Sequence, residues 1–396
     1  MARGLFLMMP AHGHVNPTIG LVNELLKKGD KITYICGEEF KNKFKDMDIK
    51  FIGFNNILNS EQSVTDIMLN MLELHLEINK LELELALKEQ GEFDYVVVDP
   101  FIMPGEKLLK KFKIKKIITT TTTFALNKEV LWDMYKCIDE QNTKILQEAE
   151  KNFENIKTKF NEVGRKFGIK FPSSPIEILA GMDSDLKIVF TSKYYQPYSK
   201  NFDNTFKFVG PSIFNRHELQ NFNIKNLHSK KMVFISLGTI ANNNKKFYND
   251  CFEALGSRKD LNVIMSIGNN VSITEFEKIP ENFRVYNYVP QLEVLKQVDL
   301  FITHGGMNSS SEGLYNGVPL IVVPQFADQP LVARRITELG AGISLIGSIT
   351  PKDIDNAVNK ILLNNSYKKN AEKIGESLKN CGGYKEAADS IHNILK

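Results

Sequence analysis

The sequence predicts an α/β fold with two doubly wound, Rossmann-like domains, and two observations support this prediction. Apolar runs of strand length alternate with amphipathic segments of helical length from residue 5 to residue 209, and the alternation starts again at residue 232. A chain of 396 residues also exceeds one ordinary domain and fits two domains of about 200 residues each. We expect the two domains to face each other across a cleft and, because ligand sites favour domain interfaces, we expect a ligand site in that cleft.

The first half of the chain contains the first series of elements. A strand and a glycine-containing loop precede an amphipathic helix that ends at Gly29. Residues 64–88 have partly alternating apolar positions, but their length and their Leu, Glu and Lys content favour a helix over a strand. The expected strands cover residues 5–9, 31–36, 95–98, 116–120, 186–190 and 206–209, and later helices cover residues 105–112 and 127–167.

The second half repeats the pattern after a polar linker. Its last helix places Ala387, Ile391 and Ile394 on one face. The expected strands cover residues 232–236, 261–267, 284–288, 300–303 and 320–323. The predicted boundaries are residues 1–212 for the N-terminal domain, 213–229 for the linker, 230–380 for the C-terminal domain and 381–396 for a final helix.

Composition excludes several classes of protein. A hydrophobic content of 42% with 24% charged residues is ordinary for a soluble globular protein, and a net charge of +3 without a basic run gives no support for nucleic-acid binding. No apolar stretch approaches the ~20 residues of a membrane span. The cysteines, Cys36, Cys137, Cys251 and Cys381, lack paired spacing, so we expect free thiols in a reducing cytoplasm.

A group of polar residues around the strand at residues 300–303 is typical of an anion site. Gly305 and Gly306 allow close approach of the backbone, and Asn308 and Ser309 follow at a helix start, where the helix dipole favours negative charge. His304 adds a donor, and Glu312 adds an acceptor suited to ribose hydroxyls. Taken singly, these features are equally well explained as a helix cap and a strand end. A second polar pair, Asp328-Gln329, follows the next strand, and capping does not require such a pair.

A second constellation lies in the first half. His14 follows the first strand in the segment His12-Gly-His14, and Asp99 follows the strand at residues 95–98. A histidine there can act as a general base if a carboxylate holds its tautomer. Alternatively, His14 is a surface-loop histidine and Asp99 caps the segment before Pro100. The hypothesis that His12 and His14 are a pair of metal ligands has less support, because the spacing marks no third ligand. The segment His12-Gly-His14 has a single glycine, which disfavours a nicotinamide or flavin enzyme.

Motifs along nearly the whole chain resemble those of the UDP-glycosyltransferase superfamily, glycosyltransferase family 1, and specifically its bacterial macrolide glycosyltransferase group. The resemblance implies the GT-B fold, with the acceptor in the N-terminal domain, the nucleotide sugar in the C-terminal domain, and the last helix packed back on the N-terminal domain. The motifs are Pro10-Ala-His-Gly-His14-Val-Asn-Pro-Thr, Phe208-Val-Gly-Pro-Ser212, Ile235-Ser-Leu-Gly-Thr239, Val289-Pro-Gln-Leu-Glu-Val-Leu295, Thr303-His-Gly-Gly-Met-Asn-Ser309 and Asp328-Gln329.

Carried over to this sequence, the resemblance makes His14 the base that deprotonates the acceptor and Asp99 its orienting partner. Tyr288 stands where many members have a tryptophan that stacks on uracil, which leaves uracil versus thymine open. The implied nucleotide-sugar ligands are Ser236, Thr239, His304, Gly306, Asn308 and Ser309 for the diphosphate, Glu312 for the ribose, Tyr288, Val289 and Gln291 for the base, and Asp328 and Gln329 for the sugar.

The resemblance therefore implies an inverting, metal-independent transfer of a hexose to a hydroxyl of a hydrophobic small molecule such as a macrolide or flavonoid. We expect glucose from UDP-glucose as donor, no cofactor besides this co-substrate, and a monomer or weak dimer. Two alternatives stay open: a GT-B sugar-nucleotide epimerase, and a non-catalytic nucleotide-binding partner of another transferase. The acceptor segments near residues 55–87 and 120–135 match no pattern that names a substrate.

Overall fold

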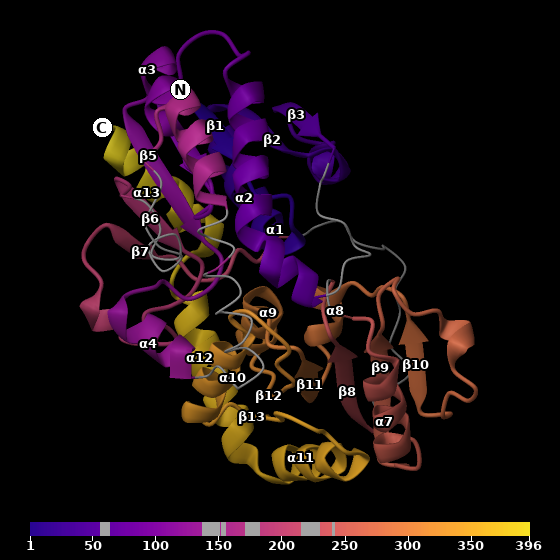
Figure 1. The fold of residues 1–396 in the computed structure, drawn as a ribbon. Coiled ribbons are helices and arrows are strands. Elements are labelled where there is room, and N and C mark those ends of the chain that lie inside the picture. Colours follow the sequence, from indigo (N-terminus) through magenta and orange to yellow (C-terminus); the bar gives the residue numbers. More distant parts are fainter. Residues whose placement is uncertain (56–63, 137–150, 152–155, 171–182, 215–229, 240–241) are drawn as a thin grey trace. The chain divides into compact units, whose positions relative to one another are not determined.

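The computed structural model describes residues 1–55, 64–136, 151, 156–170, 183–214, 230–239 and 242–396 (Figure 1). The chain forms two compact units: unit 1 contains Met1–Phe214 and Cys381–Lys396, and unit 2 contains Asn215–Asn380. Apart from residues 213 and 214, the predicted linker lies outside the described residues. Each unit is built on a parallel sheet, so the expected α/β class with two doubly wound domains is confirmed.

Unit 1 has a seven-stranded parallel sheet with the order β3-β2-β1-β4-β5-β6-β7. From β1 the chain moves outward to β2 and β3 and then returns to place β4 on the other side of β1. The topological switch point, where open α/β sheets bind ligands, therefore lies between β1 and β4. The strands are β1 Arg3–Leu7, β2 Lys31–Gly37, β3 Lys50–Phe54, β4 Tyr95–Val98, β5 Lys116–Thr121, β6 Leu186–Val189 and β7 Phe206–Phe208.

The helices of unit 1 include the predicted one between residues 64 and 88, which is confirmed as α2. The C-terminal helix α13, yellow in Figure 1, belongs to this unit and packs against α1 in its core. The helices are α1 His12–Lys27, η1 Glu38–Phe44, α2 Val64–Ala86, α3 Gly105–Phe112, α4 Lys128–Lys136, a helical segment at residues 156–167, η2 Ser199–Asn201 and α13 Gly383–Leu395.

Unit 2 repeats the design with a six-stranded parallel sheet in the order β10-β9-β8-β11-β12-β13, so its switch point lies between β8 and β11. The strands are β8 Lys231–Ser236, β9 Leu261–Ser266, β10 Phe283–Tyr286, β11 Leu300–Thr303, β12 Leu320–Val322 and β13 Gly342–Ser344. The helices are α7 Lys245–Leu255, η3 Ile273–Glu275, α8 Gln291–Leu295, α9 Met307–Tyr315, α10 Gln329–Glu338, α11 Pro351–Leu363 and α12 Asn365–Lys379.

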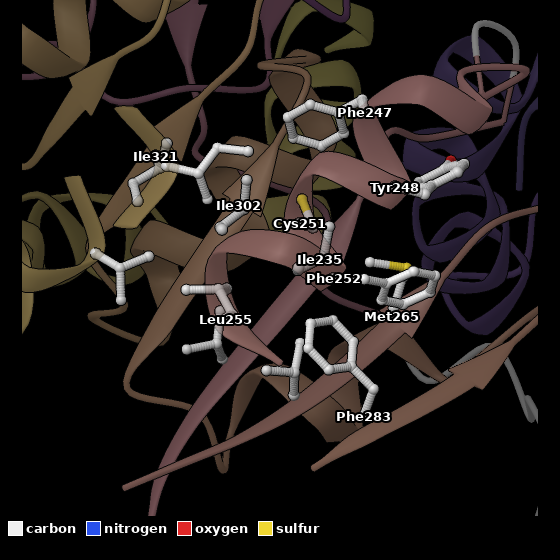
Figure 2. Packing of buried hydrophobic residues seen from close by; sticks show 14 of the residues in the cluster. Ile235, Phe247, Tyr248, Cys251, Phe252, Leu255, Met265, Phe283, Ile302 and Ile321 are labelled. Atoms are coloured by element: carbon white, nitrogen blue, oxygen red, sulfur yellow. The ribbon is translucent and has the colours of Figure 1, made fainter. Parts of the chain in front are cut away.

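One side of the unit 2 sheet is covered by α7 (Figure 2). Its apolar face, which includes Phe247, Cys251 and Leu255, packs on side chains of the central strands such as Ile235 and Met265. The polar residues described below lie at the carboxyl ends of these strands. Among the described residues, no helix combines the length and the apolar character needed to cross a membrane.

Candidate active site

The first group of site residues lies at the switch point of unit 1. Leu7 and Val98 are paired in the sheet, so the segments that follow β1 and β4 leave from adjacent positions. His14 and Asp99 meet there, with Nδ1 of His14 2.5 Å from Oδ2 of Asp99. The Asp99 side chain is fully buried, whereas 25% of the His14 side chain is exposed. Because Asp99 holds Nδ1, Nε2 is the nitrogen that can take a proton from a substrate.

The expectation that His14 lies in a glycine loop is wrong. Helix α1 begins at His12, directly after the extended Ala11, so His14 lies in the first helical turn. Gly13 and Pro17 suggest a loop, but α1 includes both residues, and Pro17 lies inside the helix although its ring removes the N–H that would donate to the carbonyl four residues earlier. The helical turn therefore fixes the backbone of His14 more firmly than a loop would.

Asp99 also organises the segment that follows it. Its Oδ1 accepts a hydrogen bond from the amide of Phe101 at 3.2 Å, and its carbonyl accepts one from the amide of Ile102 at 2.9 Å. The alternative that Asp99 caps this segment is thus correct for one oxygen, while the other oxygen holds His14. Both functions come from one buried carboxylate.

His12 makes a ring contact with Phe40. The two rings pack edge-on with their centroids 5.1 Å apart, and His12 is exposed. In the part of the chain that the structure describes, no group of three or more His, Cys, Asp or Glu residues has an arrangement that could hold a metal ion. The weaker hypothesis of a metal pair at His12 and His14 gains no third ligand there.

The structure adds three polar residues that the sequence did not single out: His75, Asn79 and Glu82 of α2. The His75 ring stacks on Phe101, with centroids 4.3 Å apart and an interplanar angle of 15°. Asn79 exchanges hydrogen bonds with the backbone of Met103, and Glu82 is fully buried. Their spacing of four and three residues places them on one helix face, which is the signal that could have identified them.

Burial changes the protonation of two of these residues. Loss of water contact lowers the pKa of His75 to about 4, against the opposing effect of the Asp99 charge, so the imidazole is neutral at pH 7. Burial raises the pKa of Glu82 well above its usual range, and the Asp99 charge adds to the effect; the Met8 backbone acts in the opposite direction to a smaller extent. Asp99 is therefore accompanied by a neutral histidine and by a carboxyl group whose protonated form is favoured by burial.

The second group of site residues lies at the switch point of unit 2. The helix that follows β11 starts at Met307, with Gly306 as N-cap and no side-chain cap hydrogen bond. Asn308 and Ser309 lie inside the first turn, so neither caps the helix as the alternative proposed. The amides of a first helical turn do not donate to carbonyls within the helix, and together with the helix dipole they favour an anion at this end.

His304 lies between two glycines at this switch point. A Cβ on Gly238 would come within 2.5 Å of the imidazole Cε1, and a Cβ on Gly306 within 2.4 Å of Nε2. Burial lowers the pKa of His304 to about 4, while the Ser236 backbone works in the opposite direction. Ser236 pairs with Thr303 across β8 and β11 and is buried, whereas Thr239 is exposed. A neutral imidazole therefore stands beside the helix start.

The residues expected around the nucleoside also come together. Nε2 of Gln291 donates to Oε2 of the buried Glu312 at 2.7 Å and to Oγ of Ser309 at 3.3 Å. Val289 is buried, and Tyr288 beside it is 50% exposed. Gln291 thus joins the expected base-binding turn to the expected ribose and phosphate residues.

The pair Asp328-Gln329 starts α10, after β12. Oε1 of Gln329 accepts hydrogen bonds from the amides of Gln325 and Phe326 at 2.8 and 3.3 Å. The carboxamide oxygen therefore holds its own loop, and this side chain can offer a sugar hydroxyl only its Nε2. Ala327, just before the pair, has a left-handed backbone with φ of 56°, a conformation that is costly for a non-glycine residue.

Known proteins share this architecture. The family model described as UDP-glucoronosyl and UDP-glucosyl transferase matches residues 170–379. An uncharacterized UDP-glucosyltransferase, YojK of Bacillus subtilis (strain 168), is 35% identical over 100% of this chain and 98% of its own length. Demethyllactenocin mycarosyltransferase of Streptomyces fradiae is 26% identical over 100% of this chain and 87% of its own length.

A solved structure shows the same fold. The crystal structure of the glycotransferase of kitacinnamycin matches with a TM-score of 0.83 at 25% identity, covering 100% of this chain and 99% of that chain. The match confirms the GT-B architecture expected from the sequence, and the relatives confirm the resemblance on which that expectation rested. The chain is a glycosyltransferase and belongs to the UDP-glucoronosyl and UDP-glucosyl transferase family.

Proposed function

We propose that this glycosyltransferase moves glucose from UDP-glucose to a hydroxyl of a hydrophobic small molecule, with inversion at the anomeric carbon. The observation that carries the proposal is the 2.5 Å contact between His14 and the buried Asp99 at the unit 1 switch point. A base oriented in this way suits the activation of an oxygen nucleophile.

In the proposed step, Nε2 of His14 takes the proton of the acceptor hydroxyl. The oxygen attacks the anomeric carbon from the face opposite the nucleotide, a new C–O bond forms, and the bond between that carbon and the diphosphate oxygen breaks. UDP leaves with the electron pair, and Asp99 stabilises the imidazolium. The products are the inverted glycoside, UDP and one proton, which His14 later releases to water.

The unit 2 residues support the choice of donor. The first turn of α9, with His304 beside it, offers backbone N–H donors to the developing charge of the diphosphate, a role that requires no metal in this proposal. Gln291 and Glu312 would hold the ribose, Tyr288 would stack on the base, and Asp328 and Gln329 would hold the sugar. Glucose and UDP are favoured by the likeness to a UDP-glucosyltransferase, and a macrolide acceptor by the likeness to demethyllactenocin mycarosyltransferase.

The cellular location and the oligomeric state of the enzyme are part of the proposal. Cys36 and Cys251 are buried free thiols, and Cys381 is a partly exposed one, which suits the reducing cytoplasm; Cys137 lies outside the described residues. We propose a cytoplasmic monomer or weak dimer.

The test combines UDP-glucose or TDP-glucose with macrolide and flavonoid acceptors and follows the glycoside by mass spectrometry. We expect product with UDP-glucose, unchanged by EDTA, and about 10²–10⁴-fold slower turnover for His14→Ala with UDP binding retained. Configuration of the product, read by NMR, tests inversion. Wild-type turnover in His14→Ala would refute the base. Consumption of UDP-glucose without an acceptor, giving an epimeric UDP-sugar, would favour an epimerase.

A further inference from the structure

We propose that one face of α2, formed by His75, Asn79 and Glu82, positions the Asp99 carboxylate and through it the catalytic His14. These three are positioning residues: contacts link His75 and Asn79 to the loop of residues 99–103, and Glu82 is buried close enough to Asp99 for that charge to raise its pKa. The inference rests on the proposed function, because it assigns a purpose to residues that act on the proposed base.

A continuous chain of contacts joins α2 to His14. Asn79 donates to the carbonyl of Met103 at 3.1 Å and accepts from its amide at 3.4 Å, which fixes the far end of the loop. His75 stacks flat on the ring of Phe101, and the amide of the same Phe101 donates to Asp99 Oδ1. The ring of Phe101 also lies 6.2 Å from that of His14.

The polar character of this face is unusual for its surroundings. The α2 side chains beside it, including Leu76, Ile78 and Leu83, pack in an apolar core with the loop residue Ile102. Nδ1 of His75 is buried without a partner at hydrogen-bond distance among the described residues, and the Glu82 carboxyl is buried with the Met8 backbone beside it. Apolar residues would fill such a face at lower cost, so stability alone does not account for it.

Charge supports the same assignment. The titratable groups near Asp99 are His14, His75, Glu82, Cys36 and Tyr34. Burial keeps His75 neutral and raises the pKa of Glu82, which favours its protonated form, and it raises the pKa of Cys36 and of Tyr34 so that these are neutral too. Asp99 is consequently the charge that His14 experiences from this group, and its position sets the basicity of His14.

The test measures kcat/KM against pH for His75→Leu, which removes the stacked ring. A displaced Asp99 stabilises imidazolium less, so we expect the acid limb of the profile to move to lower pH. We also expect kcat to fall about 10-fold, within the ~10²-fold that a 1 Å misplacement can cost, with KM for the donor unchanged. His75→Phe keeps a flat ring on Phe101 and should restore wild-type values.

Asn79→Ala removes both contacts to Met103 without touching the ring stack, and the same shift is expected. The Asn79→Ala variant can therefore test the inference even if His75→Leu does not fold. Glu77→Gln is the matched control: it lies on α2, pairs with Lys80 at 3.3 Å, is 39% exposed and should leave the profile unchanged.

Three outcomes would overturn the inference: a wild-type profile in both His75→Leu and Asn79→Ala, an unshifted profile with raised KM for the donor, or no rescue by His75→Phe. The proposed function fails separately, because its failure appears as full activity in His14→Ala. If His14→Ala is inactive while His75→Leu and Asn79→Ala behave as wild type, the positioning inference alone is wrong.

Discussion

At the scale of single residues, the candidate nucleotide site requires two positions without a side chain. Gly238 and Gly306 lie on either side of His304, and any side chain at either position would collide with the imidazole. Of the pair Gly305-Gly306, the second glycine is therefore needed for close approach of the backbone to the ring, whereas a Cβ on Gly305 would meet Val322. The sequence predicted Gly306 for a ligand, and the structure shows that the histidine also requires it, together with Gly238.

Gly238→Ala should therefore weaken UDP binding. Gly347→Ala is the matched control, because both glycines have φ of 81° but nothing lies within 4 Å of a Cβ at Gly347. Both variants should lose about 1 kcal/mol of unfolding free energy from the left-handed backbone, and Gly238→Ala should lose more because the ring must move. Titration calorimetry should show at least ~10-fold weaker UDP binding in Gly238→Ala only. Equal affinities in the two variants would contradict this role of His304.

At the scale of elements, α13 completes the core of unit 1 from the far end of the chain. Ala387, Ala388 and Ile391 are fully buried there, and Gly20 of α1 permits close packing, since a Cβ would lie 2.9 Å from the Tyr384 ring. The carboxylate of the buried Asp30 accepts three hydrogen bonds. Their donors are Nε2 of His392 at 2.9 Å, the Tyr95 hydroxyl at 2.9 Å and the Ala2 amide at 3.1 Å. This carboxylate ties α13 to the sheet.

His392→Ala should therefore destabilise unit 1 by about 1–3 kcal/mol, because it leaves a buried carboxylate short of one donor. Asp389→Ala on the same helix breaks the ion pair with Lys28, whose partners are 53% and 28% exposed, and should cost about 0–1 kcal/mol. Urea unfolding followed by circular dichroism compares the two. A cost in His392→Ala no larger than in Asp389→Ala would show that the hydrogen bond adds little.

Elements with a strong local pattern could be predicted, and those defined by distant partners could not. The central strands are uninterrupted apolar runs, and the Leu-rich α2 has the length of a helix, so their types were predicted correctly. The edge strands β3 and β13 were missed because β3 mixes Lys50 and Gly53 with its apolar residues and β13 has only three residues. The helical spacing of His75 and Asn79 could have marked them as one face, but their contacts could not be predicted, since the residues they contact lie 26 and 24 positions away along the chain.

At the scale of the whole molecule, each unit contains a half-buried, neutral histidine beside its candidate site: His75 in unit 1 and His304 in unit 2. The switch points that bring them there follow from strand order, which the alternating pattern predicted in outline. Their burial follows from side-chain packing, which the pattern does not contain. The same feature in both units gives the stability of the chain a definite dependence on pH.

Both histidines have a folded-state pKa of about 4 and an unfolded value of about 6.5, so the unfolded chain binds more protons between these values. Each histidine should therefore remove stability as pH falls from about 6.5 to about 4, by at most about 1.4 kcal/mol per pH unit. Glu82 acts in the opposite sense, because its raised pKa favours the folded state at low pH and this stabilisation is lost as pH rises.

The contribution of the histidines is isolated by comparing variants. Unfolding free energies in urea between pH 7 and pH 4.5 should fall less steeply in His75→Gln and in His304→Gln than in the wild type, and least steeply in the double variant. Glutamine keeps a polar side chain but takes up no proton, so the difference in slope reports the missing protonation. An unchanged slope in His304→Gln would mean that the imidazole is already solvated in the folded protein, and its neutral role at the candidate diphosphate site would then be wrong.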